Sequence, residues 1–152
     1  MESSQKQGRY ERLITQLKGL LPKSGDPIAR MATISAVLAN KIEYFFWCGF
    51  YRVEGDTLIV GPYQGPVACQ ELKDGGVCWA SVNRKESVVV PDVHQFPGHI
   101  ACDSRSNSEI VIPVFDKDSK LVAVLDVDSS SYSSFDETDR IHLETIAAMV
   151  FA

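Results

Sequence analysis

The sequence has few cysteines, no long run of hydrophobic residues and no excess of basic residues. It contains 4 cysteines in 152 residues, at positions 48, 69, 78 and 102, and a domain of this length buries a sizeable core without disulfide bonds. No hydrophobic run is long enough to cross a bilayer, and residues 1–8 are too polar for a secretion signal. We therefore expect a cytoplasmic protein with no membrane partner, whose cysteines serve redox chemistry or metal binding.

The charge balance excludes a second class of partner. The formal net charge is −5, whereas a nucleic-acid-binding protein would show a basic patch. The sequence also lacks a phosphate-binding glycine loop and the Gly-x-Ser-x-Gly elbow of hydrolases. With 45% hydrophobic and 23% charged residues, the composition is that of one globular domain. We expect this domain to span 1–152, with an N-terminal helix and turn over 1–26 and a core over 27–152.

Hydrophobic spacing predicts helices near both ends of the chain and antiparallel strands between them. The expected helices cover residues 10–21, residues from 27 with Asp26 as N-cap, residues 77–84 and a segment from about 136. The expected strands cover 46–53, 57–63, 67–72, 87–90, 109–115 and 120–128. This order predicts an α+β fold, with one antiparallel sheet and helices packed on it.

The cysteines differ in their expected surroundings. Cys48 lies on one face of its strand among aromatic residues, which predicts a small core residue. Trp47 and Tyr51 share the other face of that strand. Cys102 instead lies in the polar loop 92–108, and loops of this length in compact domains are usually functional. The loop containing Cys102 is therefore the first candidate site.

Three acidic residues are expected near this loop. Asp126 and Asp128 alternate with apolar residues, so both project from the same face of the last strand. If Glu109 lies on the neighbouring strand of the hairpin, the three acids converge near Cys102. Burial and like charges both raise the pKa of a carboxyl group, so one of the three could hold a proton near neutral pH. The alternative is that the two aspartates only end the strand and cap its turn.

A thiol beside a protonated carboxyl group suits attack on a peroxide or a sulfoxide, because the departing oxygen needs a proton. The product is a sulfenic acid, which a second cysteine, Cys69 or Cys78, can convert to a disulfide. A zinc site is the rival, because His94 and His99 lie close to Cys102. Their spacing, H-x4-H-x2-C, resembles no standard zinc pattern. The two histidines are instead expected to anchor the loop by hydrogen bonds.

Five segments of the sequence match motifs of a known enzyme family. They are WCGFY (47–51), GPYQG with VAC (61–69), GVC (76–78), DVHQFPGHIACDSRSNSEIVIPV (92–114) and LDVDS (125–129). Together they resemble the free methionine-(R)-sulfoxide reductases, which are stand-alone GAF-domain enzymes. The match runs in order from about residue 38 to the last helix, and the loop motif together with LDVDS is far more specific than a general GAF pattern.

The resemblance implies a role for each cysteine outside the core. Cys102 matches the nucleophile that attacks the sulfoxide sulfur, and Cys69 matches the usual resolving cysteine. Cys78 matches a third cysteine whose role varies in the family. The implied reaction is the reduction of free L-methionine-(R)-sulfoxide to methionine, through a sulfenic acid and an intramolecular disulfide that thioredoxin reduces.

The resemblance also implies how the substrate binds. Glu109, Asp126 and Asp128 match the acids that hold the substrate amino group and assist protonation of the sulfoxide oxygen. Trp47 matches an aromatic wall of the pocket, and Tyr51 on the same strand face joins it. Proteins of this kind need no organic cofactor or metal. A homodimer is left open.

The sequence departs from the family pattern beside Cys78. Trp79 stands where the family commonly has glycine, and Asp74-Gly75 stands where a basic residue often precedes the motif. Two other functions stay open: a GAF module that binds a small ligand without chemistry, and a redox-sensing protein without a substrate. Three cysteines outside a core strand favour the enzyme over the first, and turnover of free methionine sulfoxide separates it from the second.

Overall fold

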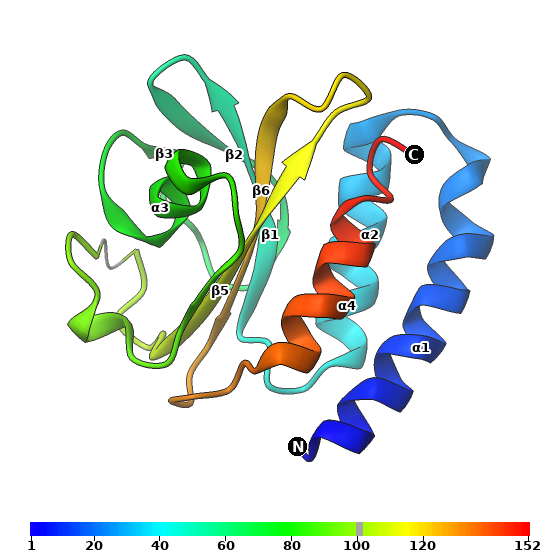
Figure 1. The fold of residues 1–152 in the computed structure, drawn as a ribbon, viewed down its shortest axis with the longest axis horizontal. Coiled ribbons are helices and arrows are strands. Elements are labelled where there is room, and N and C mark those ends of the chain that lie inside the picture. Colours follow the sequence, from blue (N-terminus) through cyan, green and yellow to red (C-terminus); the bar gives the residue numbers. More distant parts are fainter. Residues whose placement is uncertain (100–101) are drawn as a thin grey trace.

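The computed structural model describes residues 1–99 and 102–152, and its centre is a six-stranded antiparallel sheet (Figure 1). The strand order is β3-β2-β1-β6-β5-β4. The strands are β1 (Trp47–Glu54), β2 (Thr57–Gln64), β3 (Glu71–Leu72), β4 (Val88–Val90), β5 (Ser108–Phe115) and β6 (Leu121–Ser129). The helices are α1 (Ser3–Leu20), α2 (Pro27–Lys41), α3 (Gly76–Arg84) and α4 (Glu137–Ala147), with 3-10 turns over Leu21–Lys23 and Val93–Gln95. The predicted α+β fold is confirmed.

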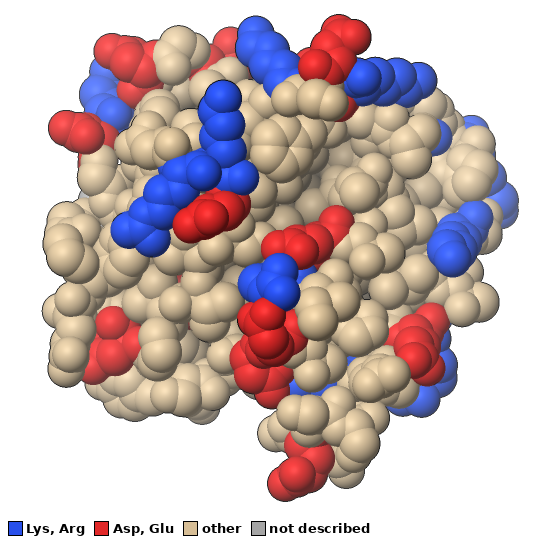
Figure 2. Space-filling model, in the orientation of Figure 1, with Lys and Arg blue, Asp and Glu red and all other residues tan. Residues whose placement is uncertain are grey.

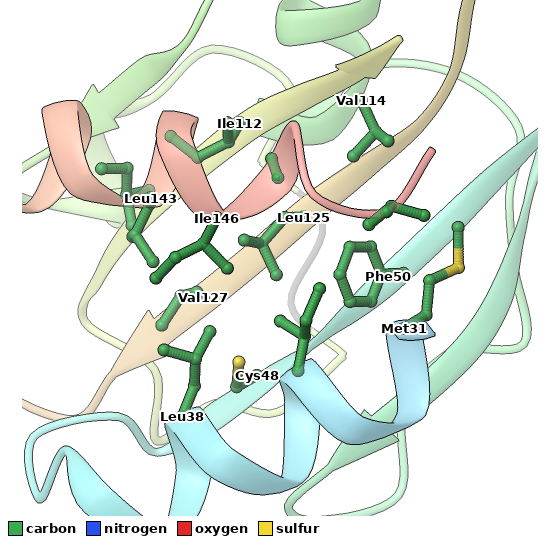
Figure 3. Close-up of a cluster of buried hydrophobic side chains, with 14 of the residues drawn as sticks. Met31, Leu38, Cys48, Phe50, Ile112, Val114, Leu125, Val127, Leu143 and Ile146 are labelled. Carbon is green, nitrogen blue, oxygen red and sulfur yellow. The ribbon is translucent and has the colours of Figure 1, made fainter. Parts of the chain in front are cut away.

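The two faces of the sheet carry different helices. In Figure 1, α1, α2 and α4 lie on one side of the sheet, and α3 lies on the other. The core between the sheet and the first group contains Cys48 and Phe50 of β1, packed with Leu38 of α2 and Ile146 of α4 (Figure 3). Cys48 is fully buried there, and burial raises its pKa. It is the core residue that the sequence predicts, and it faces away from the α3 side.

The surface carries both signs of charge. On the face shown in Figure 2, Lys and Arg side chains lie among Asp and Glu side chains, with uncharged surface between them. None of the helices in the described ranges is both long enough and apolar enough to pass through a membrane.

Several element ends follow the predicted local chemistry. Asp26 caps α2, because its side chain accepts hydrogen bonds from the backbone N–H groups of Ile28 and Ala29 at 2.8 and 3.1 Å. Gly55 lies in the turn between β1 and β2 with a φ of 65°, a conformation that favours glycine. The hairpin around it was predicted and is confirmed.

Three predicted boundaries are wrong. The strand expected over 67–72 is only the two-residue β3, where aromatic side chains bind several carbonyl groups of the segment 66–72. Helix α3 begins at Gly76, one residue before the predicted start at 77, and α1 begins at Ser3. The loop expected over 92–108 contains the 3-10 turn Val93–Gln95, and its residues 100 and 101 lie outside the described residues.

A buried ion pair joins α1 to α4. The Nζ atom of Lys6 lies 2.6 Å from Oδ2 of Asp139, and the two side chains are 5% and 0% exposed. The hydroxyl groups of Tyr10 and Tyr44 donate to Oδ1 of Asp139 at 2.7 and 2.6 Å. The backbone N–H of Asp136 donates to Oδ2 at 2.8 Å. Each oxygen of this buried carboxylate therefore has two donors.

We expect Lys6→Met to lower the free energy of unfolding by about 3–5 kcal/mol, because it leaves the charge of Asp139 buried without its cation. Urea denaturation monitored by circular dichroism measures the change. The matched control is Lys18→Met on the same helix, where the side chain is exposed and the expected change is below about 0.5 kcal/mol. Equal midpoints for Lys6→Met and the wild type would contradict the assignment.

Candidate active site

Three carboxyl groups from two adjacent strands meet on the α3 side of the sheet. The strand register pairs Glu109 of β5 with Asp128 of β6, and Asp126 projects from the same face of β6 two residues earlier. Glu109 and Asp126 are buried, and Asp128 is half-buried. All three line one cavity of about 60 Å³. The structure thus brings the three acids together as the hairpin pattern predicts.

Burial raises the pKa of all three carboxyl groups. For Glu109, burial is the largest cause, and the charges of Asp126 and Asp128 add to it. Oδ1 of Asp126 is buried and has no hydrogen-bond partner among the described residues. The cluster therefore retains a proton above the ordinary carboxyl range and leaves an acceptor open to a cationic or proton-donating group.

Cys78 and Cys102 line the same cavity, and Cys69 is joined to Cys102. Cys69 and Cys102 form a disulfide with a Cα–Cα distance of 5.5 Å, which is the pairing that the resemblance implies. Cys78 lies in the first turn of α3 as a buried free thiol. Burial is the main cause of its raised pKa, and the charges of Asp126 and Glu109 raise it further. Cys78 is therefore held as a protonated thiol.

An aromatic wall borders the acids. Trp47 and Tyr51 project from the pocket face of β1, with ring centroids 5.9 Å apart. Trp47 also stacks on Tyr63 of β2 at 5.1 Å. Gly49 lies between Trp47 and Tyr51 in the sequence and pairs with Asp126. A Cβ atom at this position would come 2.8 Å from Tyr63 Cα and 2.9 Å from the Trp47 ring, so the absence of a side chain permits the stacking.

Three aromatic side chains hold the segment that carries Cys69. Each donates one hydrogen bond to a backbone carbonyl oxygen of that segment. The pairs are Trp47 Nε1 with Pro66 at 3.1 Å, Tyr51 Oη with Cys69 at 2.8 Å, and Trp79 Nε1 with Leu72 at 2.9 Å. These bonds explain why most of the segment stays outside the sheet. They also fix the position of Cys69 by contacts other than the disulfide, and they give Trp79, the departure from the family pattern, a structural role.

Polar contacts anchor the loop that carries Cys102. The guanidinium group of Arg105 donates to Asp103 at 2.7 and 3.0 Å and lies 4.9 Å from the ring centroid of Phe46. The hydrogen bonds from Arg105 lower the pKa of Asp103 to about 2. His94 Nε2 lies 2.8 Å from Oδ1 of Asn107, so the predicted anchoring role of His94 is confirmed.

The cavity is also lined by residues that the sequence did not single out as pocket residues. The polar ones are His99, Asp103 and Ser106. His99 was considered only as a metal ligand or a loop anchor. Burial and the neighbouring His94 lower its pKa. All three lie within four residues of Cys102, and this proximity is the signal that could have identified them.

The comparison with known proteins agrees with this geometry. The GAF domain family matches residues 31–150, so the fold and the pocket define a GAF domain with a disulfide beside an acidic cluster. The chain is 43% identical over 147 residues to GAF domain-containing protein A of Dictyostelium discoideum, and the aligned region covers 95% of this chain and 92% of that protein.

Two further relatives specify the branch of the family. Free methionine-R-sulfoxide reductase of Escherichia coli (strain K12) is 39% identical over 142 residues, covering 93% of this chain and 86% of that protein. The X-ray structure of free methionine-R-sulfoxide reductase from Neisseria meningitidis in complex with its substrate has a TM-score of 0.88 at 39% identity, covering 93% of this chain and 85% of that chain. The chain belongs to the free methionine-R-sulfoxide reductase family of GAF domains.

The raised carboxyl pKa values predict how stability depends on pH. A folded carboxyl group with a raised pKa keeps a proton that the unfolded chain has already released. The free energy of unfolding therefore falls as the pH rises from the ordinary carboxyl value of 4.5 towards the folded pKa of Glu109. We expect Glu109→Gln to be more stable than the wild type by roughly 0.5–2 kcal/mol at about pH 8, with a smaller difference at about pH 5.

Urea denaturation at the two pH values measures this difference. The matched control is Asp118→Asn, which removes an exposed carboxylate from the turn between β5 and β6 and is expected to change stability by less than about 0.5 kcal/mol at either pH. A Glu109→Gln variant less stable than the wild type at the higher pH would show that the buried acid stabilises the fold.

Proposed function

We propose that the protein reduces free L-methionine-(R)-sulfoxide to methionine with its own thiols. The observation that carries this proposal is the Cys69–Cys102 disulfide in a cavity that is also lined by Glu109, Asp126 and Asp128. A disulfide that joins Cys69, in the segment before β3, to Cys102, in the loop 92–108, is the expected oxidised product of such a reaction. The names of the Escherichia coli relative and of the Neisseria meningitidis complex support the choice of substrate.

The first step transfers oxygen from the substrate to the protein. The thiolate of Cys102 attacks the sulfoxide sulfur, and a proton from the acid cluster passes to the sulfoxide oxygen. The hydroxyl group then moves from the substrate sulfur to the Cys102 sulfur as the bond between the two sulfurs breaks, so methionine leaves and Cys102 becomes a sulfenic acid. Glu109 suits the role of proton donor, because burial and both aspartates raise its pKa. The substrate sulfur gains two electrons, and Cys102 supplies them.

The second step forms the disulfide. The thiol of Cys69 attacks the Cys102 sulfur, and the oxygen leaves as water. The Cα–Cα distance of 5.5 Å between the two residues lies in the normal range for a disulfide. Cys78 suits this role less well, because its raised pKa reduces the thiolate fraction that attack requires.

Thioredoxin then completes the cycle in this proposal. Its dithiol supplies the two electrons and two protons that return Cys69 and Cys102 to thiols. The cytoplasm fits this cycle, because thioredoxin keeps thiols reduced there.

The acid cluster selects the free amino acid in this proposal. The ammonium group of the substrate offsets the repulsion among the buried carboxylates and fits the unpartnered Oδ1 of Asp126. Trp47 and Tyr51 then border the apolar part of the substrate side chain.

We expect Cys102→Ser to abolish turnover of the R diastereomer in a thioredoxin-coupled assay, while the wild type turns it over and leaves the S diastereomer nearly untouched. The control is Cys48→Ala, which removes a thiol from the opposite face of the sheet. Residual Cys102→Ser activity within about tenfold of wild type, a barrier change of about 1.4 kcal/mol, would move the nucleophile to Cys69 or Cys78. A wild type inactive on both diastereomers would favour a ligand-binding or redox-sensing module.

We expect the protein to discriminate strongly against N-acetylated methionine sulfoxide. The neutral amide would leave a buried carboxylate unpaired, at a cost of about 3–5 kcal/mol, which corresponds to a loss of roughly a hundredfold to several thousandfold in kcat/KM. Asp128→Asn should raise KM for the free amino acid without creating activity on the acetylated one. Comparable kcat/KM values for the two substrates would contradict the role given to the acids.

A further inference from the structure

The acid cluster includes a sulfur atom that the proposed reaction does not use. The Sγ atom of Cys78 and one carboxylate oxygen each from Glu109 and Asp126 all lie within 4.8 Å of one another. All three residues are buried. The sulfur comes from α3 and the oxygens come from β5 and β6, so three separate elements converge on this point.

This set of atoms has the chemistry of a metal site as well as of an ammonium site. A thiolate combined with carboxylates suits borderline cations such as Zn²⁺, whereas Mg²⁺ and Ca²⁺ prefer oxygen ligands alone. We propose that Cys78, Glu109 and Asp126 bind one divalent cation of the zinc class, and that this cation excludes the amino group of the substrate. The exclusion of the substrate rests on the proposed function, whereas the binding of the cation does not.

A second, independent observation points to a cation here. Asp126 is 5% exposed, lines the cavity, and has a buried Oδ1 atom without a hydrogen-bond partner among the described residues. By contrast, the buried Asp139 has two hydrogen-bond donors on each oxygen. A buried acceptor without a donor is costly, and a bound cation would remove that cost.

The distances allow coordination after a small movement of side chains. Zinc binds sulfur at about 2.3 Å and carboxylate oxygen at about 2.0–2.2 Å, so tetrahedral ligand atoms lie about 3.6 Å apart. The three atoms, already within 4.8 Å of one another, need to close by about 1 Å. Asp128 lines the same cavity, and water can complete the coordination. Because Glu109 and Asp126 serve both occupants, cation and substrate compete.

The test uses Co²⁺ as the probe and the wild-type protein with its disulfide intact, so that only Cys48 and Cys78 remain as thiols. Cobalt bound to a thiolate gives a near-ultraviolet charge-transfer band. We expect this band to saturate at one cobalt per chain, to disappear on addition of Zn²⁺, and to be absent in Cys78→Ser. The matched control Cys48→Ser should keep the band. Asp126→Asn, which retains both thiols, should weaken cobalt binding at least about tenfold.

Competition experiments with the substrate test separately whether the cation binds and whether it occupies the substrate site. Free methionine sulfoxide should reduce the cobalt band, and Zn²⁺ should raise KM without lowering kcat in the thioredoxin-coupled assay, reversibly on chelation. Absence of the band in the wild type, or its persistence in Cys78→Ser, would overturn the metal site. A band unaffected by saturating methionine sulfoxide would overturn the shared location. A wild type that binds cobalt but turns over no sulfoxide would refute the proposed function and leave the metal site supported.

Discussion

The burial of three carboxyl groups side by side is the constraint on which the rest of the site depends. Like charges in a buried environment raise one another's pKa, and isolated carboxylates are costly to remove from water. Glu109, Asp126 and Asp128 nevertheless lie on β5 and β6, which are interior strands of the sheet with a neighbour on each side. The strands fix the carboxyl groups in place, so a proton or a bound cation must relieve the repulsion. This requirement connects the fold to a cationic substrate.

The four cysteines carry the same side chain but lie in three different environments. Cys48 is enclosed by the apolar core, and Cys78 is kept protonated by its burial and by the charges of the neighbouring carboxylates. Cys69 and Cys102 instead lie on segments outside the regular strands, where they form the disulfide. The resemblance implied this pairing before the structure showed it. The environment of each sulfur, more than its position in the sequence, determines which of the four suits redox chemistry.

Local pattern was sufficient to predict much of the site. The period of two in β6 placed Asp126 and Asp128 on one face, and pairing within the hairpin then placed Glu109 beside them. The path of residues 67–72 was not predictable in the same way, because it depends on which carbonyl groups come within reach of aromatic donors after folding. Trp79 shows the difference: the sequence marked it as unusual, but only the folded chain reveals that its indole N–H binds a carbonyl three residues beyond Cys69.

The two buried aspartates of this chain show what the site lacks. Asp139 is enclosed between α1 and α4, and the chain itself supplies Lys6, two tyrosine hydroxyl groups and a backbone N–H as its donors. Asp126 is almost as buried, but one of its oxygens has no partner among the described residues. The same fold therefore can satisfy a buried carboxylate completely, and in the pocket it does not. A deficit of this kind lowers the stability of the free protein and leaves binding energy available to a cation. The proposed ammonium group of methionine sulfoxide and the proposed zinc-class ion would each supply the missing partner, and they would compete for the same oxygen.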